Sequence, residues 1–159
     1  MLHVVGVAGT FGPLHIGHKA LLQKAFEVGQ KVLIALTTEQ MLKKKERKDK
    51  IPDYELRKLA LERYLEAEGY HGRYEVIPLD DPYGVAITLP EQQGIVISEE
   101  TLKGAQEINE IRIKRHLKPL KIFTIKLLTA EDGLPISSTR IRKDEIDQVG
   151  HLLKNSDPS

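Results

Sequence analysis

Two histidines near the start of the chain have the residue type and the spacing to bind a phosphate group. His15 and His18 lie three residues apart in the run from Gly9 to His18, which contains three glycines. Glycines let the main chain come close to a ligand, and the start of a helix presents N–H groups to an anion. Because apolar residues 4–8 precede the run and a helical pattern over 19–26 follows it, we predict a strand-to-helix turn. In that turn, free N–H groups of the helix and both imidazoles would bind phosphate oxygens.

The same run excludes two common nucleotide-binding loops. No Gly-Lys-Ser or Gly-Lys-Thr follows it, so it is not a P-loop. Its glycine spacing also differs from Gly-x-Gly-x-x-Gly, the loop of dinucleotide-binding folds. The predicted phosphate site is therefore of another kind.

The remainder of the chain alternates strand patterns with helical patterns. Apolar or alternating runs predict strands over 4–8, 31–37, 74–79, 94–98 and 121–128, and helices are expected over 53–69, 99–117 and from 136 onward. The helix over 53–69 carries Leu56, Leu59, Ala60 and Leu65 at helical spacing, so we expect them on its buried side. Such alternation predicts one α/β domain, residues 1–153, with a Rossmann-like, doubly wound, parallel five-stranded sheet and helices on both faces. Residues 154–159 are expected to form a disordered tail.

Composition limits the class of protein. The 159 residues suffice for one domain with its own core, and the absence of cysteine excludes disulfides and thiolate metal sites. A formal net charge of +1 gives no global field that would attract nucleic acid, and no apolar run reaches the roughly 20 residues of a membrane span. We expect a cytoplasmic protein without nucleic-acid or membrane partners, and a monomer because no apolar stripe stands out.

Two short motifs, one near each end of the chain, resemble those of the nucleotidyltransferase superfamily. His15-Ile16-Gly17-His18 resembles its HxGH motif, and the run from Ile136 to Arg142, Ile-Ser-Ser-Thr-Arg-Ile-Arg, resembles its ISSTxIR motif. Between them, Asp81-Pro82-Tyr83-Gly84 and Ile97-Ser98-Glu99-Glu100-Thr101 resemble the archaeal and eukaryotic type of phosphopantetheine adenylyltransferase. The resemblance implies that the chain transfers an adenylyl group from ATP to 4′-phosphopantetheine, which gives dephospho-coenzyme A and pyrophosphate.

The resemblance also implies roles for individual residues. ATP would be bound by Gly9, Phe11, His15, His18, Ser137, Ser138, Thr139 and Arg142. His18, Thr10 and Lys43 would act on the reacting phosphates, with Lys44 or Lys45 as alternatives to Lys43. Phosphopantetheine would be bound by Thr10, Lys43, Asp81, Pro82 and Tyr83. Bacterial relatives carry arginines after the fourth strand that this chain lacks, and the residues expected to replace them in ATP binding are Lys103, Thr101 or Asn109.

Adenylyl transfer depends on positioning rather than on a strong base. A phosphate oxygen of the acceptor attacks the α-phosphate of ATP in line, and a phosphomonoester is already a nucleophile at neutral pH. Imidazoles, cations and hydroxyls suit this reaction because they hold two polyanions together and stabilise the charge that builds in the transition state. Mg²⁺ is expected to enter with ATP, with few ligands from the protein.

Other functions share part of the pattern. Nicotinamide mononucleotide adenylyltransferases and cytidylyltransferases have both motifs, but they are not expected to carry the runs 81–84 and 98–101. A non-catalytic nucleotide sensor could lose the groups that act in the transition state, whereas this chain retains both histidines, Lys43 and Arg142. A fragment of a class I aminoacyl-tRNA synthetase would need a KMSKS-type lysine run and a basic surface, and this chain lacks the run and is not basic overall.

Overall fold

A parallel sheet of five strands runs through the middle of the structure. The computed structural model describes residues 1–42, 51–126, 128, 130–134, 136, 140–141 and 145–153. The strands have the order β3-β2-β1-β4-β5 and are β1 (Leu2–Gly9), β2 (Gly29–Thr37), β3 (Tyr74–Leu79), β4 (Gly94–Ser98) and β5 (Lys121–Ile125). All four neighbouring pairs are parallel, which confirms the predicted sheet. The strand order reverses between β1 and β4, the point at which such sheets bind ligands.

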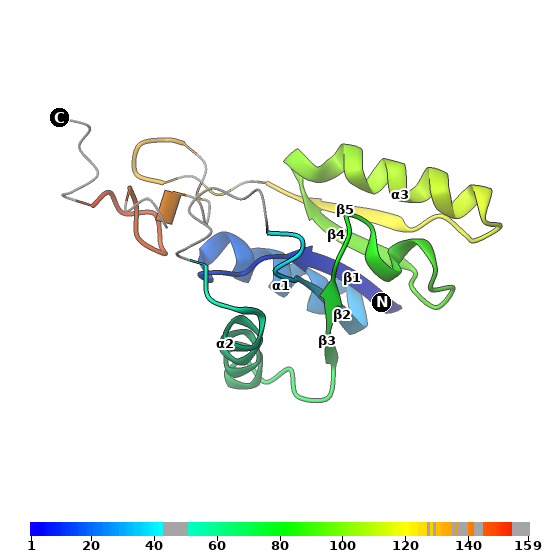
Figure 1. Ribbon diagram of the computed structural model, residues 1–159, viewed down its shortest axis with the longest axis horizontal. Helices are drawn as coiled ribbons and strands as arrows, with labels where there is room; N and C mark the ends of the chain where they lie inside the picture. The colour runs from blue at the N-terminus through cyan, green and yellow to red at the C-terminus, as the bar shows by residue number, and fades with distance from the viewer. Residues whose placement is uncertain are drawn as a thin grey trace.

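Helices cover both faces of this sheet. They are α1 (Ile16–Val28), α2 (Tyr54–Ala67) and α3 (Leu102–Lys114), with the short 3₁₀ helices η2 (Gly84–Ile87) and η3 (Glu99–Thr101). The buried core residues show which helices share a face: those of α1 and α2 belong to one cluster, and those of α3 and η2 to another. Figure 1 shows α2 and α3 at opposite sides of the molecule.

Alternate residues of β4 point into these two cores. Val96 packs in the same cluster as Leu22 of α1, whereas Ile95 and Ile97 pack in the same cluster as Ile108 of α3. A fully buried aliphatic side chain contributes roughly 1.5–3 kcal/mol, so both cores hold the strands firmly. The strand ends and the loops that follow them are therefore carried on a rigid frame.

The buried side of α2 differs from the prediction. Three residues expected in the core are exposed, namely Leu56, Leu59 and Ala60. The buried residues are Arg57, Leu61 and Leu65, which follow the i, i+4, i+8 spacing of one helical face. The cause is polar: the Arg57 guanidinium donates hydrogen bonds to main-chain oxygens of the turn after β1 and of the residues before α2. These bonds turn the face with Arg57, rather than the face with Leu56, toward the core.

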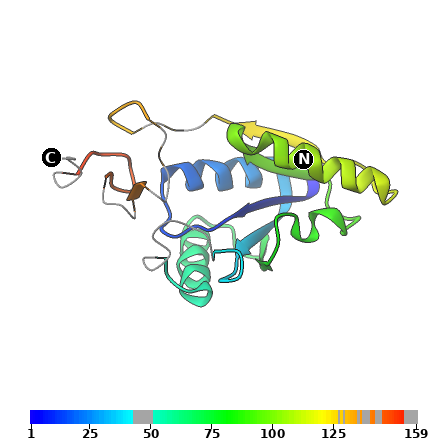
Figure 2. The same cartoon turned by 45° about the horizontal axis from the view of Figure 1, so that its top comes forward.

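The C-terminal segment packs against the start of α1. Ile136 and Ile146 are buried in a small third core that includes Ile16, and Ile16 N donates a hydrogen bond of 3.1 Å to Gln148 O. Figures 1 and 2 both show this segment at one end of the molecule. Of the helix predicted from 136 onward, residues 140–141 are helical. Ile136 and residues 145–153 are not helical, and an isolated antiparallel bridge joins Ile146 to Leu152, so the helix predicted over this stretch is wrong there. Residues 137–139 and 142–144, and the predicted tail 154–159, lie outside the described residues.

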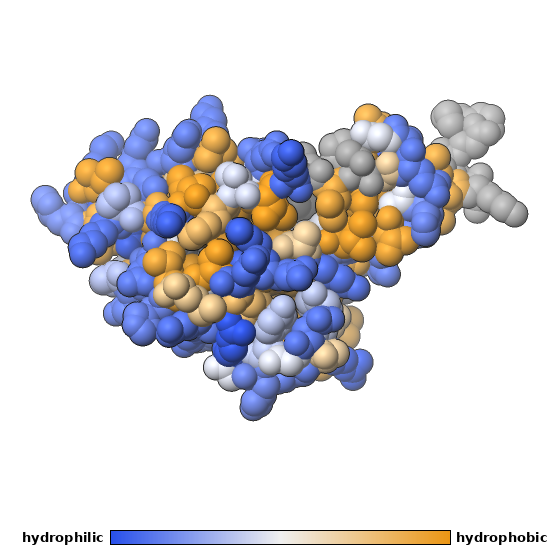
Figure 3. Space-filling model, turned by 180° about the vertical axis from the view of Figure 1, so that it is seen from behind, coloured by the Kyte–Doolittle hydropathy of each residue, from blue (hydrophilic) through white to orange (hydrophobic). Residues whose placement is uncertain are grey.

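Large apolar side chains remain exposed at that end of the molecule. Leu134, Val149 and Leu152 are among them, and Figure 3 shows apolar surface there beside the residues drawn in grey. The expectation of a monomer stays a prediction. In the described parts of the chain, every helix is too short or too polar to cross a membrane.

Candidate active site

Two histidine side chains cap the N-terminus of α1. His15 is the N-cap residue, and its Nδ1 accepts hydrogen bonds from Gly17 N at 3.0 Å and from His18 N at 3.3 Å. His18 Nδ1 in turn accepts a hydrogen bond from His15 N at 3.3 Å. This is a capping box in which imidazoles take the places usually held by a hydroxyl and a carboxylate. The two rings stack with their centroids 3.7 Å apart and 19° between their planes.

The capping bonds determine which ring nitrogen carries the hydrogen. A nitrogen that accepts a hydrogen bond from a main-chain N–H is unprotonated, so each neutral ring carries its hydrogen on Nε2. Burial lowers the pKa of His15 to about 4, because desolvation disfavours the charged ring, and His15 is therefore neutral at physiological pH. His15 and His18 both line one pocket, where an Nε2–H group suits a phosphate oxygen.

The start of α1 does not offer the free N–H groups expected from the sequence. Ile16 N donates to Gln148 O, and the N–H groups of Gly17 and His18 donate to the His15 ring. The expectation is wrong because the histidine at the N-cap accepts from two of these donors and the C-terminal segment accepts from the third. An anion at this turn would therefore be bound by the two rings, with support from the positive end of the helix dipole.

Phe11 and two glycines shape the turn around the rings. Phe11 has a φ of 48°, which is uncommon for a residue other than glycine, and its buried ring lies 4.8 Å from the His18 ring, centroid to centroid. A Cβ atom on Gly9 would lie 3.1 Å from the Phe11 ring, and one on Gly17 would lie 2.9 Å from the His15 ring. The Phe11 side chain, expected to contact ATP, thus supports His18 and does not line the described pocket.

A pocket of about 510 Å³ opens at the carboxyl ends of the strands. It brings together four residues predicted from the sequence: Gly9, Thr10, His15 and His18. Its described lining is otherwise mostly apolar and holds one carboxylate, Glu100, and one ammonium group, Lys126. Such a pocket can hold a drug-sized or nucleotide-sized ligand, with polar groups at a few fixed positions.

Two lining residues lie outside the motifs, because Thr37 ends β2 and Lys126 follows β5 directly. Ser98, at the end of β4, belongs to the quoted run 97–101 but was given no role of its own. The signal that could have found them is positional, because polar residues at the carboxyl ends of neighbouring parallel strands meet at one edge of the sheet. Thr101, one of the three candidates to replace the bacterial arginines, also lines the pocket.

The loop after β3 is stabilised by its own aspartate. Asp81 Oδ1 accepts hydrogen bonds from Tyr83 N at 2.9 Å and Gly84 N at 2.7 Å. The bond from Gly84 N is the main cause that lowers the pKa of Asp81, and the bond from Tyr83 N adds to it. Pro82 and Tyr83 line a smaller cleft of about 50 Å³ next to the main pocket. The main pocket and the smaller cleft share Ala8 and Leu79, so a long ligand could occupy both.

Two predicted ATP contacts are not brought to the pocket. The Asn109 side chain exchanges two hydrogen bonds with the Leu120 main chain, at 2.9 and 2.7 Å, and so joins α3 to the segment that enters β5. Lys103 is exposed in the first turn of α3 and does not line the described pocket. The remaining predicted site residues lie outside the described residues, namely Lys43, Ser137, Ser138, Thr139 and Arg142.

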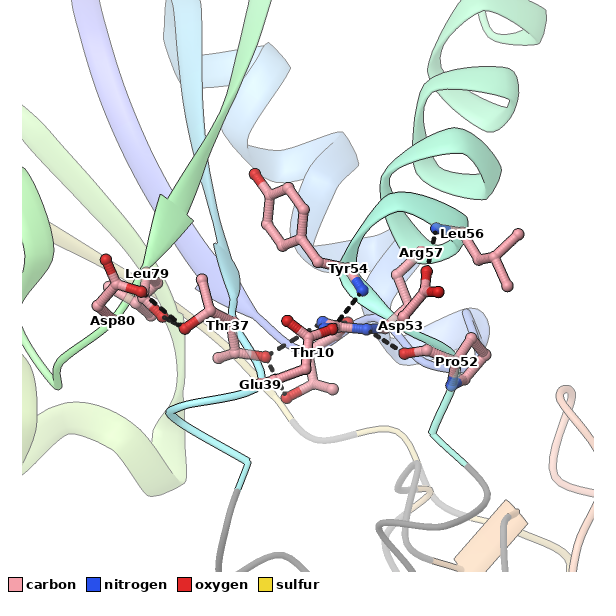
Figure 4. Close-up of polar contacts among 11 residues, drawn as sticks. Thr10, Thr37, Glu39, Pro52, Asp53, Tyr54, Leu56, Arg57, Leu79 and Asp80 are labelled. Atoms are coloured by element: carbon pink, nitrogen blue, oxygen red, sulfur yellow. Dashed lines mark hydrogen bonds and ion pairs between the residues drawn. The ribbon is translucent and has the colours of Figure 1, made fainter.

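A buried arginine behind the pocket was not predicted at all. Arg57 Nη1 donates to Thr10 O at 3.1 Å and to Thr37 Oγ1 at 3.3 Å, and its Nε donates to Pro52 O at 2.8 Å (Figure 4). Two acidic residues act on its charge, namely Glu39, whose Oε1 lies 3.9 Å from Arg57 Nη2, and Asp53. Arginines are usually exposed, so this one is recognisable only as a charged residue at the core spacing of α2.

The fold and the imidazole site define a nucleotidyltransferase-like protein. The family model described as cytidylyltransferase-like matches residues 7–144. A crystal structure of a protein with unknown function from Archaeoglobus fulgidus superposes with a TM-score of 0.69 and 28% identity, over 79% of this chain and 89% of that one.

Curated relatives give a finer classification. A phosphopantetheine adenylyltransferase of Thermococcus gammatolerans is 47% identical over 150 residues, which cover 94% of each chain. One of Methanothermobacter thermautotrophicus is 44% identical over 95% of this chain and 90% of the relative. The chain therefore belongs to the phosphopantetheine adenylyltransferase family.

Proposed function

We propose that this protein transfers an adenylyl group from ATP to 4′-phosphopantetheine, giving dephospho-coenzyme A and pyrophosphate, in coenzyme A biosynthesis in the cytoplasm. The observation that carries the proposal is the near full-length match, at 47% identity, to a relative named phosphopantetheine adenylyltransferase. The pocket agrees with it, because stacked imidazoles and a small adjoining cleft suit one triphosphate and one long, thin acceptor. The alternative acceptor, nicotinamide mononucleotide, is not favoured, because the curated relatives are named phosphopantetheine adenylyltransferases.

The residues at the turn have distinct roles in this proposal. His18, aided by His15, donates from Nε2 to phosphate oxygens of ATP, and its bond to the α-phosphate strengthens as charge builds in the transition state. Thr10 meets the phosphate of the acceptor, which attacks the α-phosphate in line while pyrophosphate leaves. Lys126 supplies a positive charge from the end of β5. Lys43, Arg142 and the run 137–139 are proposed to complete phosphate binding.

Mg²⁺ is proposed to enter with ATP. The described pocket offers it oxygen ligands of the kind it prefers, namely the Glu100 carboxylate and the hydroxyl groups of Ser98 and Thr101. In the described residues, His, Cys, Asp and Glu form no group of three or more that could hold a metal ion. The phosphates of ATP would therefore supply most of the charge that binds the ion, and when bound it would neutralise charge on those phosphates.

A pyrophosphate-release assay tests the function directly. The protein is incubated with ATP or CTP and one acceptor at a time: 4′-phosphopantetheine, nicotinamide mononucleotide or phosphocholine. We expect turnover with ATP and 4′-phosphopantetheine together, and none with the other pairs. Turnover with another acceptor in preference to phosphopantetheine would overturn the proposal.

One of the lysines 43–45 is expected to contact phosphate. Lys43, Lys44 and Lys45 are replaced by alanine one at a time. One variant should lose at least about tenfold in kcat/KM, because its ammonium group contacts the phosphates, and the other two variants should be mild, because a solvated lysine contributes little. Lys43, the first after β2, is expected to be the severe one. Steady-state kinetics with both substrates measures this. Three equally mild variants would show that no single lysine of the run binds phosphate.

Asp81 is expected to govern acceptor affinity through the loop that it stabilises. Asp81→Ala removes the two hydrogen bonds to Tyr83 N and Gly84 N, so KM for phosphopantetheine should rise about tenfold while KM for ATP stays nearly unchanged. Asp81→Asn is the matched control, since its amide oxygen can accept the same bonds. A wild-type KM for phosphopantetheine in Asp81→Asn would show that Asp81 acts through the conformation of the loop. A KM raised as much as in Asp81→Ala would show that the charge of Asp81 contacts the acceptor. A rise in KM for ATP alone would assign the loop to the nucleotide side.

A further inference from the structure

A chain of hydrogen bonds leads from a buried guanidinium to the pocket. Arg57 is 1% exposed, and Thr37 and Thr10 are each 7% exposed. Arg57 Nη1 donates to Thr37 Oγ1 at 3.3 Å, and the Thr37 hydroxyl donates to Thr10 Oγ1 at 3.0 Å. Figure 4 shows these side chains converging from α2, the end of β2 and the turn after β1. Both threonines line the 510 Å³ pocket, whereas Arg57 lies behind them.

The guanidinium gives this chain its direction. An arginine has only donors, so Thr37 Oγ1 accepts from Arg57 and its own hydrogen points away from the positive charge, toward Thr10. Thr10 Oγ1 thereby accepts a hydrogen bond and has its own hydrogen left to donate. Within the described part of the chain, the Thr10 hydroxyl makes no other hydrogen bond, so that hydrogen is available to a ligand in the pocket.

Arg57 is held where it can act in this way. Its Nε donates to Pro52 O at 2.8 Å and its Nη1 also donates to Thr10 O at 3.1 Å, so the guanidinium is fixed on two sides. Glu39 Oε1 approaches Nη2 to 3.9 Å, but the Glu39 side chain is 63% exposed and water screens its charge. Nη2 itself has no hydrogen-bond partner among the described residues. Glu39 and, to a smaller extent, Asp53 therefore compensate the positive charge of Arg57 only in part.

We propose that Arg57 and Thr37 are positioning residues that orient the Thr10 hydroxyl as a hydrogen-bond donor to the phosphate of the acceptor. The inference rests on the proposed function, because it takes Thr10 as the residue that meets the attacking phosphate. Hydrogen bonds in series polarise one another, which strengthens the last donor of the chain. A donor that is oriented before the substrate arrives needs no reorganisation when charge moves in the transition state.

A double-mutant cycle tests this coupling. Thr37→Val removes the hydroxyl with little change of shape, suits a strand, and leaves Arg57 Nη1 its bond to Thr10 O. We expect kcat/KM for the acceptor to fall about tenfold, as for one lost charge-assisted hydrogen bond, and KM for ATP to stay within about twofold. In the background of Thr10→Val, the same Thr37→Val change should cost less than about twofold, because Thr37 acts only through the Thr10 hydroxyl.

The controls separate positioning from a merely structural role. Thr37→Ser keeps the hydroxyl and should retain activity, and Thr124→Val, at an exposed position of β5, should behave as wild type. Urea unfolding of each variant checks that it folds, with Thr37→Ala as the substitute should Thr37→Val fail. Arg57→Lys should lower kcat/KM for the acceptor in the wild-type background more than in the Thr37→Val background. Additive losses in either cycle, as a structural defect would produce, would overturn the proposal.

The same experiment distinguishes the two levels of inference. A wild-type enzyme that uses phosphopantetheine, with a Thr37→Val variant of equal kcat/KM, refutes the hydrogen-bond chain and leaves the proposed function intact. A wild-type enzyme that prefers another phosphorylated acceptor refutes the proposed function. The cycle is then measured with that acceptor, where coupling supports the orientation of Thr10 toward an attacking phosphate and additivity rejects it.

Discussion

Replacing His18 by alanine will lower kcat for adenylyl transfer by about 10²- to 10³-fold and leave the affinity for ATP within a few fold. The ring of His18 stacks on His15, rests against Phe11 and has its Nδ1 occupied by the His15 N–H, so its orientation in the pocket is set before ATP binds. Its Nε2–H then contributes most when charge builds on the α-phosphate, and a contact of that kind affects kcat more than ground-state binding. Single-turnover kinetics and equilibrium binding of ATP measure the two quantities separately.

A second substitution separates catalysis from helix capping. His18 also accepts the His15 N–H in the capping box, and alanine loses that bond as well. His18→Gln retains it, because a glutamine at the third helical position can reach back to the N-cap N–H. We expect glutamine to restore about 1 kcal/mol of the stability lost in the alanine variant but not its kcat. A glutamine variant with normal kcat would show that the cap, and not the Nε2–H group, is what His18 contributes.

The sheet could be predicted from the sequence because its strands are short apolar runs with clear ends. The runs 74–79 and 94–98 became β3 and β4 with the same bounds. The helix of α2 is confirmed, but of the four residues that its apolar spacing predicts to be buried, only Leu65 is buried, and Leu56, Leu59 and Ala60 are exposed. Its true face carries Arg57, because the main-chain oxygens of Pro52, just before the helix, and of Thr10, far away in the sequence, accept hydrogen bonds from the buried guanidinium. Tertiary hydrogen bonds of this kind leave no local pattern in the sequence.

The centre of the site was predictable, but its surroundings were not. His15 and His18 stand in a recognisable motif, and the structure brings them together with Gly9 and Thr10. The motif does not reveal that the two rings satisfy the helix N–H groups themselves, because that depends on the orientation of each ring. Thr37 was missed for a related reason: one hydroxyl at the end of a strand gains its role only from what packs behind it.

The stability of the protein will fall as the pH is lowered from about 6.5 to about 4, in part because of His15. The pKa of the His15 ring is lowered from 6.5 to about 4 by burial, so in this range the unfolded chain binds a proton that the folded chain does not. The contribution of His15 is complete above pH 6.5 and is lost progressively as the pH falls toward 4. At about 1.4 kcal/mol for each pH unit, the interval from 6.5 to about 4 corresponds to about 3 kcal/mol.

His15→Asn isolates this contribution, because asparagine is a good N-cap residue and does not titrate. Urea unfolding at several pH values should show a smaller loss of stability below pH 6.5 in His15→Asn than in wild type, with the two curves parallel above it. His71→Asn serves as the control of opposite sign. His71 is exposed, and its hydrogen bond to Glu66 raises its pKa, so its small contribution is present below pH 6.5 and is lost as the pH rises through the folded pKa. Identical pH slopes for wild type and His15→Asn would mean that His15 accepts a proton in the folded protein, and the assignment of its Nδ1 as a permanent acceptor at the start of α1 would then be wrong.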